Sequence, residues 1–280
     1  MTHEGGCPDI TYESQFLYRR FDDLLQPGGD DLAVSAFAVQ SNNQTIKQSD
    51  NQTISLDVWL VDDASPDQTG AKVKAAFPEV HVIEGAGGLF WCKGMRLAWD
   101  KAIASGIKYD FYLWLNDDVM LKEDAVAGVL KDYENGGGVI VGRMSSDESE
   151  CEESFGMRGD KGDWMNGNLV LVPREVYEKI GPICGDYQHG YGDHDYGLMA
   201  KRAGFPLRAS TSFCGICPEQ PERYHLLKDH SLWGRMKLLF DPKGYNLHDA
   251  VLFRYRNWGI GMAAVCLCHM LARAVFNWNE

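Results

Sequence analysis

Residues 56–65 read LDVWLVDDAS, in which a short apolar strand leads directly into two adjacent Asp residues. The pattern recurs at 111–118, FYLWLNDD, where an apolar strand ends in one Asn and two Asp. Strands and helices are expected to alternate around these two segments, which is typical of an α/β protein whose mostly parallel sheet is flanked by helices. Ligands of such sheets gather at the carboxyl ends of the strands, where this chain places its carboxylates.

Local signals predict the elements beside these two strands. Pro78 ends a first helix and Gly106 a second. The loop 85–88 contains three glycines, which allow backbone to come close to a ligand. We expect helices over 69–77, 92–105, 123–133 and 196–202, and further strands over 80–83, 138–141 and 169–172.

The first 55 residues differ from the rest of the chain. Only 32–39, LAVSAFAV, has the composition of a buried strand, and 40–55 is a polar segment that begins a near-repeat, NQTIKQSD followed by NQTISLDV. We therefore predict an atypical N-terminal region at 1–55, which could include a first strand at 32–39, a core at 56–205 and a C-terminal helical extension at 206–280.

Composition excludes several classes of protein. With 27 basic and 40 acidic side chains the formal net charge is −13, which argues against a nucleic-acid binder. The eight cysteines are scattered, and one Cys-x-x-Cys pair, Cys214 and Cys217, has no second pair to complete a zinc site. Residues 1–8 carry no basic or apolar signal-peptide region. We expect reduced thiols in a cytoplasmic protein.

One segment near the C-terminus could touch a membrane. The apolar run 258–278 is interrupted by His269 and Arg273, and its unbroken part is shorter than the roughly 20 residues of a spanning helix. Arg254 and Arg256 precede it, so 254–278 suits a helix that lies peripherally in the inner face of the membrane. A helix docked on the core is the alternative.

The Asn116–Asp117–Asp118 triplet is a candidate metal site. Adjacent carboxylates repel each other unless a positive charge lies beside them, and oxygen ligands suit Mg²⁺ or Mn²⁺, which often take only one or two protein carboxylates. Asp118 is placed best for this, with Asp117 beside it. A solvated turn or a helix N-cap is the alternative.

A second polar group lies at 187–197, where Asp193 and Asp195 flank a histidine between glycines, just before a predicted helix. A carboxylate in such a loop could act as a general base if it lies near the hydroxyl that it activates. Helix capping is again the alternative. Upstream, the turn 164–168, WMNGN, could line an acceptor pocket.

Five segments in this order resemble the family 2 glycosyltransferases of the GT-A fold, particularly bacterial enzymes that build surface polysaccharides. The resemblance covers 56–205. The segments are LVDDASPDQTG at 60–70, GGLFWCKGMRLAWDKA at 87–102, YLWLNDDVML at 112–121, NGNLVLVPREVYEKIG at 166–181 and HGYGDHDYGLMAKRAG at 189–204.

The resemblance implies an inverting, metal-dependent enzyme that moves a sugar from a nucleoside-diphosphate sugar to a glycan or lipid-linked acceptor. Asp193 corresponds to the catalytic base, and Asp118 with Asp117 to the metal motif. Trp91 and the glycine loop are similar to those of rhamnosyltransferases. The donor-binding residues that it implies are Asp62, Asp63, Gly88, Trp91, Gly94, Asn116 and Asp117, and the acceptor-binding residues are Asp195, Trp164 and Asn166.

The chain departs from the family pattern at several points. Asn116 replaces the first acid of the metal motif, Gly192 the acid before Asp193, and Met199 an arginine. His225, His230 or His248 could complete the metal site. Two other functions stay open: a sugar nucleotidyltransferase, whose basic glycine-rich loop is absent, and a catalytically degenerate binding or scaffold protein.

Overall fold

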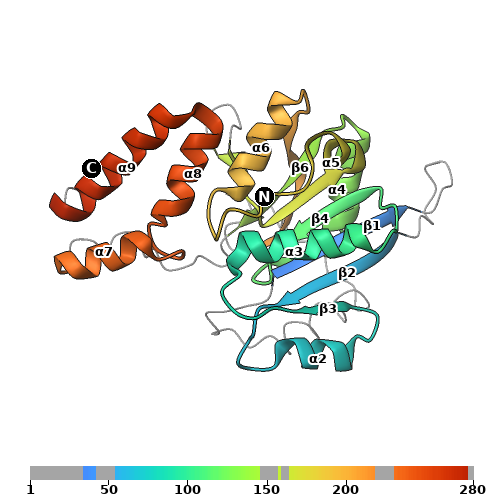
Figure 1. Ribbon diagram of the computed structural model, residues 1–280. Coiled ribbons are helices and arrows are strands. Elements are labelled where there is room, and N and C mark those ends of the chain that lie inside the picture. Colours follow the sequence, from blue (N-terminus) through green and yellow to red (C-terminus); the bar gives the residue numbers. More distant parts are fainter. Residues whose placement is uncertain (1–33, 42–53, 146–156, 159–163, 218–229, 277–280) are drawn as a thin grey trace, which may run out of the picture.

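The computed structural model describes residues 34–41, 54–145, 157–158, 164–217 and 230–276 (Figure 1). A central eight-stranded sheet has the order β3-β2-β1-β4-β9-β6-β10-β5, and a small second sheet pairs β7 with β8. The strands are β1 (Val34–Ser41), β2 (Ile54–Asp62), β3 (His81–Glu84), β4 (Phe111–Leu115), β5 (Met120–Leu121), β6 (Val139–Ser145), β7 (Met157–Arg158), β8 (Trp164–Met165), β9 (Leu169–Pro173) and β10 (Leu207–Ile216).

Eight helices are described. They are α2 (Thr69–Ala76), α3 (Phe90–Ala104), α4 (Ala125–Glu134), α5 (Arg174–Ile180), α6 (Gly192–Arg202), α7 (Leu232–Phe240), α8 (Leu247–Trp258) and α9 (Ile260–Phe276). The expected α/β architecture, a sheet flanked by helices with a helical C-terminal part, is confirmed (Figure 1).

Strand pairing differs in detail from the expected parallel arrangement. Five strands, β2, β3, β4, β6 and β10, run in one direction, but β1 and β9 lie between them in the opposite direction. Only the β2–β3 and β6–β10 neighbours are therefore parallel. A parallel neighbour needs a crossover connection of a dozen or more residues, usually helical, and the segment between β1 and β2 has no helical pattern. It is compatible with antiparallel pairing.

The register brings three chain segments together at one end of the strands, here called one edge of the sheet. The strands β2 and β4 end there, and because β9 is antiparallel to β4, its first residue Leu169 pairs with Leu115, the last residue of β4. Asp62–Asp63, Asn116–Asp118 and the turn before β9 therefore come to the same edge.

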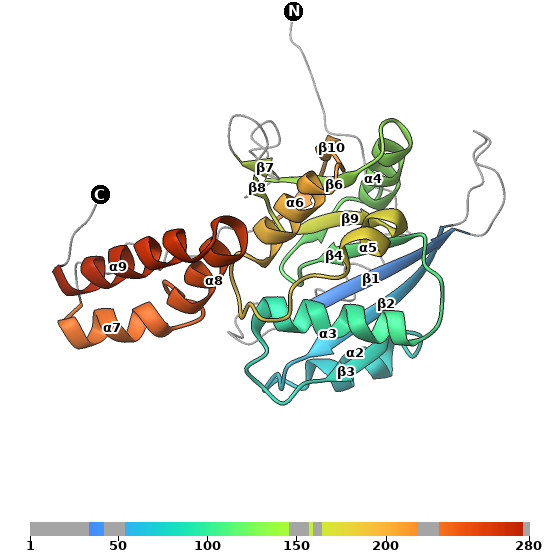
Figure 2. The same ribbon diagram turned by 45° about the horizontal axis from the view of Figure 1, so that its top comes forward.

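The core has one layer on each side of the sheet, since successive side chains of a strand point to opposite faces. In β4, Tyr112 and Trp114 face Trp99 of α3 and Tyr196 of α6, while Leu113 and Leu115 pack with Val129 of α4. Helices α3, α5 and α6 thus cover one face, and α4 and α2 cover the other (Figure 2).

The helices α7, α8 and α9 form an arm that projects from the sheet (Figures 1 and 2). Leu239, Leu247 and Ala274 make its small core. The strand β10 belongs to the central sheet, so residues 207–216 are not part of the helical extension predicted from 206, and the first described helix after this strand begins at Leu232. Within the described ranges, no helix is both long and apolar enough to cross a membrane.

Candidate active site

Asn116 lies at the centre of a polar cluster where β4 ends and β9 begins. Its side-chain oxygen accepts a hydrogen bond from Nε1 of Trp91 at 2.6 Å, and its Nδ2 donates to Oδ1 of Asn168 at 2.8 Å. Its backbone N–H donates to the Asn168 carbonyl at 3.1 Å. Asn116 therefore uses both halves of its amide to join helix α3 to the turn before β9, which an aspartate could not do.

Asp193, in the first turn of α6, reaches the same turn. Its Oδ2 accepts a hydrogen bond from the backbone N–H of Gly167 at 3.0 Å, and its Oδ1 accepts from the N–H of His194 at 2.8 Å. The side chain keeps 19% of its exposure. Asp193 is thus linked through Gly167 and Asn168 to Asn116, and it remains accessible to a ligand.

Gly167 is the point of closest approach in this cluster. A Cβ atom at this position would lie 2.5 Å from Cζ2 of Trp91 and 3.4 Å from Cβ of Asp193. Both distances are measured to side chains that the cluster itself fixes in place. Only glycine lets the turn pass between Trp91 and Asp193.

Asp117 and Asp118 form an acidic pair just after β4. Oδ2 of Asp117 is buried and has no hydrogen-bond partner within the described part of the chain. Burial, followed by the charge of Asp118, raises the pKa of Asp117 to about 7. Oδ1 of Asp118 lies 4.0 Å from Sγ of Cys217, whose pKa is raised to about 12 by burial and then by both carboxylates.

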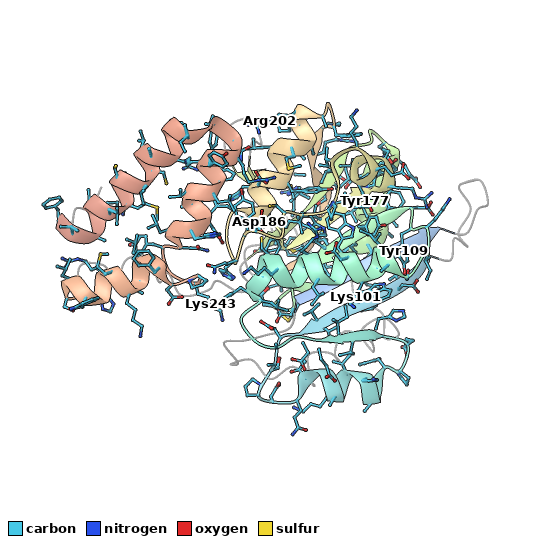
Figure 3. All side chains as sticks on the ribbon, in the orientation of Figure 1. Lys101, Tyr109, Tyr177, Asp186, Arg202 and Lys243 are labelled. Carbon is cyan, nitrogen blue, oxygen red and sulfur yellow. The ribbon has the colours of Figure 1, made fainter. Side chains whose placement is uncertain are left out.

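A divalent cation fits this pair, because two crowded carboxylates and an orphaned buried oxygen are what a cation would neutralise. Lys243, in the connection between α7 and α8, lowers the pKa of Asp117, but less than burial and Asp118 raise it (Figure 3). In the described residues there is no group of three or more His, Cys, Asp or Glu side chains that could hold a metal. Among the described residues, the two carboxylates are the side chains at this position that could serve as ligands.

Asp62 and Asp63 bind the backbone of neighbouring loops. Asp62 accepts hydrogen bonds from the N–H groups of Ser65 and Gly70, both at 2.8 Å, and so holds the start of α2. Asp63 accepts from the N–H groups of Gly87 at 2.8 Å and Leu89 at 2.6 Å. Both carboxylates thus shape the loops at this edge of the sheet.

The remaining predicted residues lie in several places. Gly88 has a φ of 85° and open space around it, whereas Gly94 is buried inside α3. Asn166 accepts a hydrogen bond from the N–H of Asn168 at 2.9 Å and closes the turn. Trp164 belongs to β8, but its side chain lies outside the described residues, as does His225. His248 contacts Asp249 at 2.8 Å.

The structure corrects the acceptor assignment of Asp195. Its carboxylate is only 2% exposed, and it accepts hydrogen bonds from Nε of Arg256 at 2.9 Å and Nδ2 of Asn257 at 2.7 Å. Both partners belong to α8, some 60 residues later in the chain. A carboxylate occupied in this way holds two helices together and does not face an acceptor.

Asp249 and Arg256 contact the segment that carries Asp193, which the sequence did not reveal. Asp249 is fully buried in α8 and accepts hydrogen bonds from three consecutive backbone N–H groups of the segment before Asp193. The only local signal is the spacing Asn246-x-x-Asp249, which predicts a capped helix start. Asn246 does accept from the N–H of Asp249, at 3.1 Å.

Comparison with known proteins gives one family match. The family model described as glycosyl transferase family 2 matches residues 42–188, just over half of the chain. No curated protein matches the sequence.

Several solved structures are similar in shape. The mannosyltransferase PcManGT from Pyrobaculum calidifontis, in complex with GDP-Man and Mn²⁺, is 16% identical with a TM-score of 0.44, over 76% of this chain and 65% of that one. Residues 1–349 of S. aureus TarS are 10% identical with a TM-score of 0.43, over 77% and 70%. The present chain thus spans about two thirds of the length of these two solved chains.

Proposed function

Because the chain belongs to the family 2 glycosyltransferases, we propose that it moves a sugar from a nucleoside-diphosphate sugar to a hydroxyl of a glycan or lipid-linked acceptor, with inversion at the anomeric carbon. We assign the reaction to cell-surface polysaccharide synthesis, in the cytoplasm at the inner face of the membrane. The observation that supports this most is the link from Asp193 through Gly167 and Asn168 to Asn116, next to the acidic pair Asp117–Asp118.

Asp193 is the proposed general base. It would take the proton from the acceptor hydroxyl while the oxygen of that hydroxyl attacks the anomeric carbon, and the bond from that carbon to the diphosphate breaks on the opposite face. The hydrogen bonds from Gly167 and His194 hold the carboxylate in one orientation, and its partial exposure leaves room for the hydroxyl. Base catalysis of this kind contributes roughly 10²- to 10⁴-fold.

Asp118 and Asp117 are the proposed ligands of Mg²⁺ or Mn²⁺. When bound, the ion would neutralise negative charge on the nucleoside diphosphate. The buried, unpartnered Oδ2 of Asp117 and its raised pKa support this assignment. Lys243 carries a further positive charge that acts on Asp117, and we assign it to the same diphosphate.

The donor is proposed to lie along the loop 85–89 and the start of α3. Asp63 holds this loop by two backbone hydrogen bonds, Gly88 leaves open space, and Trp91 is fixed by Asn116. Asp62 and the buried Gly94 would act by shaping this region, because neither is free to contact a sugar. The turn at 164–168, with Trp164 and Asn166, remains the proposed acceptor side.

Turnover with a panel of nucleotide sugars, dTDP-rhamnose included, tests the proposal. In the presence of Mn²⁺ the protein should release nucleoside diphosphate from one donor. Asp193→Asn should lower turnover roughly 10²- to 10⁴-fold, because the amide cannot accept the proton, while donor binding measured by thermal shift stays nearly unchanged. Asp100→Asn is the matched control, since Asp100 is exposed and its ion pair among the described residues is with Arg96 of its own helix.

Three results would contradict the proposal. Near-normal turnover of Asp193→Asn would remove Asp193 from the role of base. Failure of the wild-type protein to bind any donor would favour a non-catalytic scaffold. Formation of a nucleotide sugar from a sugar phosphate and a nucleoside triphosphate would favour a nucleotidyltransferase.

A further inference from the structure

One face of helix α8 packs against residues 188–195, the segment that carries Asp193. Asp249, Phe253 and Arg256 are four and three residues apart, a spacing that places them on the same side of a helix. They contact, in the same order along the chain, residues 188–190, Tyr191 and Asp195.

The first contact fixes the backbone ahead of Asp193. The carboxylate of Asp249 accepts hydrogen bonds from the N–H groups of Gln188 at 3.0 Å, His189 at 2.9 Å and Gly190 at 3.1 Å. Asn246 adds a fourth donor at 2.5 Å. Consecutive backbone N–H groups form a concave binding site for an anion, and this one is filled by a side chain of the protein. Asp249 is fully buried, so water does not compete for these bonds.

The second contact supports a strained residue. Tyr191 has a φ of 64°, a conformation that non-glycine residues rarely adopt. Its ring stacks on Phe253 with centroids 5.1 Å apart and an angle of 25° between the planes. Phe253 is completely buried, and Tyr191 directly precedes the first turn of α6. The stack therefore fixes the direction in which α6 begins.

The third contact lies just after Asp193. Nε of Arg256 donates to Asp195 at 2.9 Å, and Asn257 donates to the other oxygen of the same carboxylate at 2.7 Å. A buried carboxylate is costly unless it is paired, so Asp195 keeps the first turn of α6 against α8. Asp193 thus lies between two points at which α8 holds its segment.

We infer that this face of α8 is the positioning element for the proposed base, and that Asp249, Phe253 and Arg256 act on transfer only through the orientation of Asp193. The inference rests on the proposed function. It assigns the C-terminal arm a role at the site: α8 holds the base while α7 and α9 pack on the far side of the same helix.

The first experiment compares Asp249→Asn with Val251→Ala in the full-length protein. Val251 is partly buried and packs on the arm core, away from the segment, so its truncation tests simple destabilisation of α8. Asp249→Asn should speed amide hydrogen exchange at 188–190 about tenfold or more and lower kcat by about tenfold or more, with the donor KM changed less than about twofold. Val251→Ala should lower the melting temperature without either effect.

The second experiment tests for rescue. Arg256→Gln removes the positive charge beside the buried carboxylate of Asp195, which keeps a hydrogen bond from the neutral Asn257, and it should lower kcat about tenfold. Adding Asp195→Asn gives a neutral amide pair of similar shape, and the double variant should recover most of the lost kcat. A purely stabilising ion pair would affect melting temperature alone and leave kcat of the folded protein unchanged.

The outcomes separate the two proposals. Unchanged hydrogen exchange at 188–190 in Asp249→Asn, or unchanged kcat despite faster exchange, would overturn the positioning role of α8 even in an active enzyme. If the wild-type protein transfers sugar from no donor, the proposed function is overturned. Faster hydrogen exchange at 188–190 in Asp249→Asn would then show only that α8 stabilises this segment, without a role in catalysis.

Discussion

Asn116 illustrates how one residue replaces an expected acid for a structural reason. Its amide accepts from Trp91 and donates to Asn168, so it joins α3, β4 and the start of β9. A carboxylate at this position would accept from Trp91 but could not donate to Asn168, and it would place a third negative charge beside Asp117 and Asp118. The negative charge of the triplet is therefore confined to its last two residues.

The buried carboxylate of Asp117 should lower the free energy of unfolding of the metal-free protein when it is ionised. The folded state holds the proton more tightly than the unfolded chain, with a pKa of about 7 against 3.8, so the contribution of this group to stability falls as pH rises from about 4 to about 7. Asp117→Asn should therefore stabilise the protein in EDTA, by up to about 4 kcal/mol at about pH 8 and by less at about pH 5.

Urea unfolding at the two pH values measures this difference. Added Mn²⁺ should stabilise the wild-type protein and have little effect on Asp117→Asn combined with Asp118→Asn. If Asp117→Asn increases the free energy of unfolding equally at both pH values, or more at the lower one, the raised pKa of Asp117 is contradicted.

Among the helices and strands, the sequence predicts those whose own residues carry a clear pattern. β2 and β4 are apolar runs that end in acids, and α3 has a clear helical spacing of apolar residues. β10 was not predicted, because its sequence LRASTSFCGI is polar and partly exposed. α6 begins at Gly192 and not at Tyr196, since glycine is a poor helix former whose use here depends on packing.

Contacts between distant elements could not be predicted from the sequence, because they depend on which residues far apart in the chain meet after folding. The strand β1 was expected near its observed position, but its direction depends on pairing with β2 and β4. Asp195 carries no local sign that Arg256 neutralises it. Asp193, Asn116 and Trp91 were predicted as a set through the resemblance, and the structure brings them to one cluster.

The approach of α3 to the turn before β9 can be tested through Gly167. Gly167→Ala would place a Cβ 2.5 Å from the Trp91 ring, so that the ring or the turn must shift and the hydrogen bond to Asp193 with it. We expect kcat to fall about tenfold or more, since small displacements of a reacting group are costly. Gly128→Ala is the control, because Gly128 lies in α4 with open space around it and alanine favours helix. Full activity of Gly167→Ala would show that the turn is not part of the site.

At the scale of the whole molecule, charge and apolar surface are segregated. Between residues 231 and 276 there are six basic and two acidic side chains, in a chain whose net charge is −13. The arm also exposes large apolar side chains, with Trp233 85%, Ile260 77% and Phe276 77% exposed. A basic, apolar helical surface suits an anionic lipid interface, and we propose that the arm lies on the membrane there.

Liposome sedimentation tests this placement. The protein should bind vesicles that contain phosphatidylglycerol, bind phosphatidylcholine vesicles more weakly, and be released partly by salt. Trp233→Ser combined with Ile260→Ser should weaken binding about a hundredfold or more, because each large side chain that is buried contributes roughly 1.5–3 kcal/mol and about 1.4 kcal/mol corresponds to a tenfold change. Ile107→Ser, which removes an exposed side chain of the body, should not. Equal sedimentation of the double variant and the wild type would exclude the arm as the contact.

The place of α8 in the chain sets the order of events during synthesis. Asp249, Phe253 and Arg256 all follow residue 246, after every strand of the central sheet has left the ribosome. A nascent chain that has released only the sheet has Asp193 but not the helix that orients it. The proposed base is therefore held in place only after residues 247–258 have been synthesised and α8 has packed against its segment.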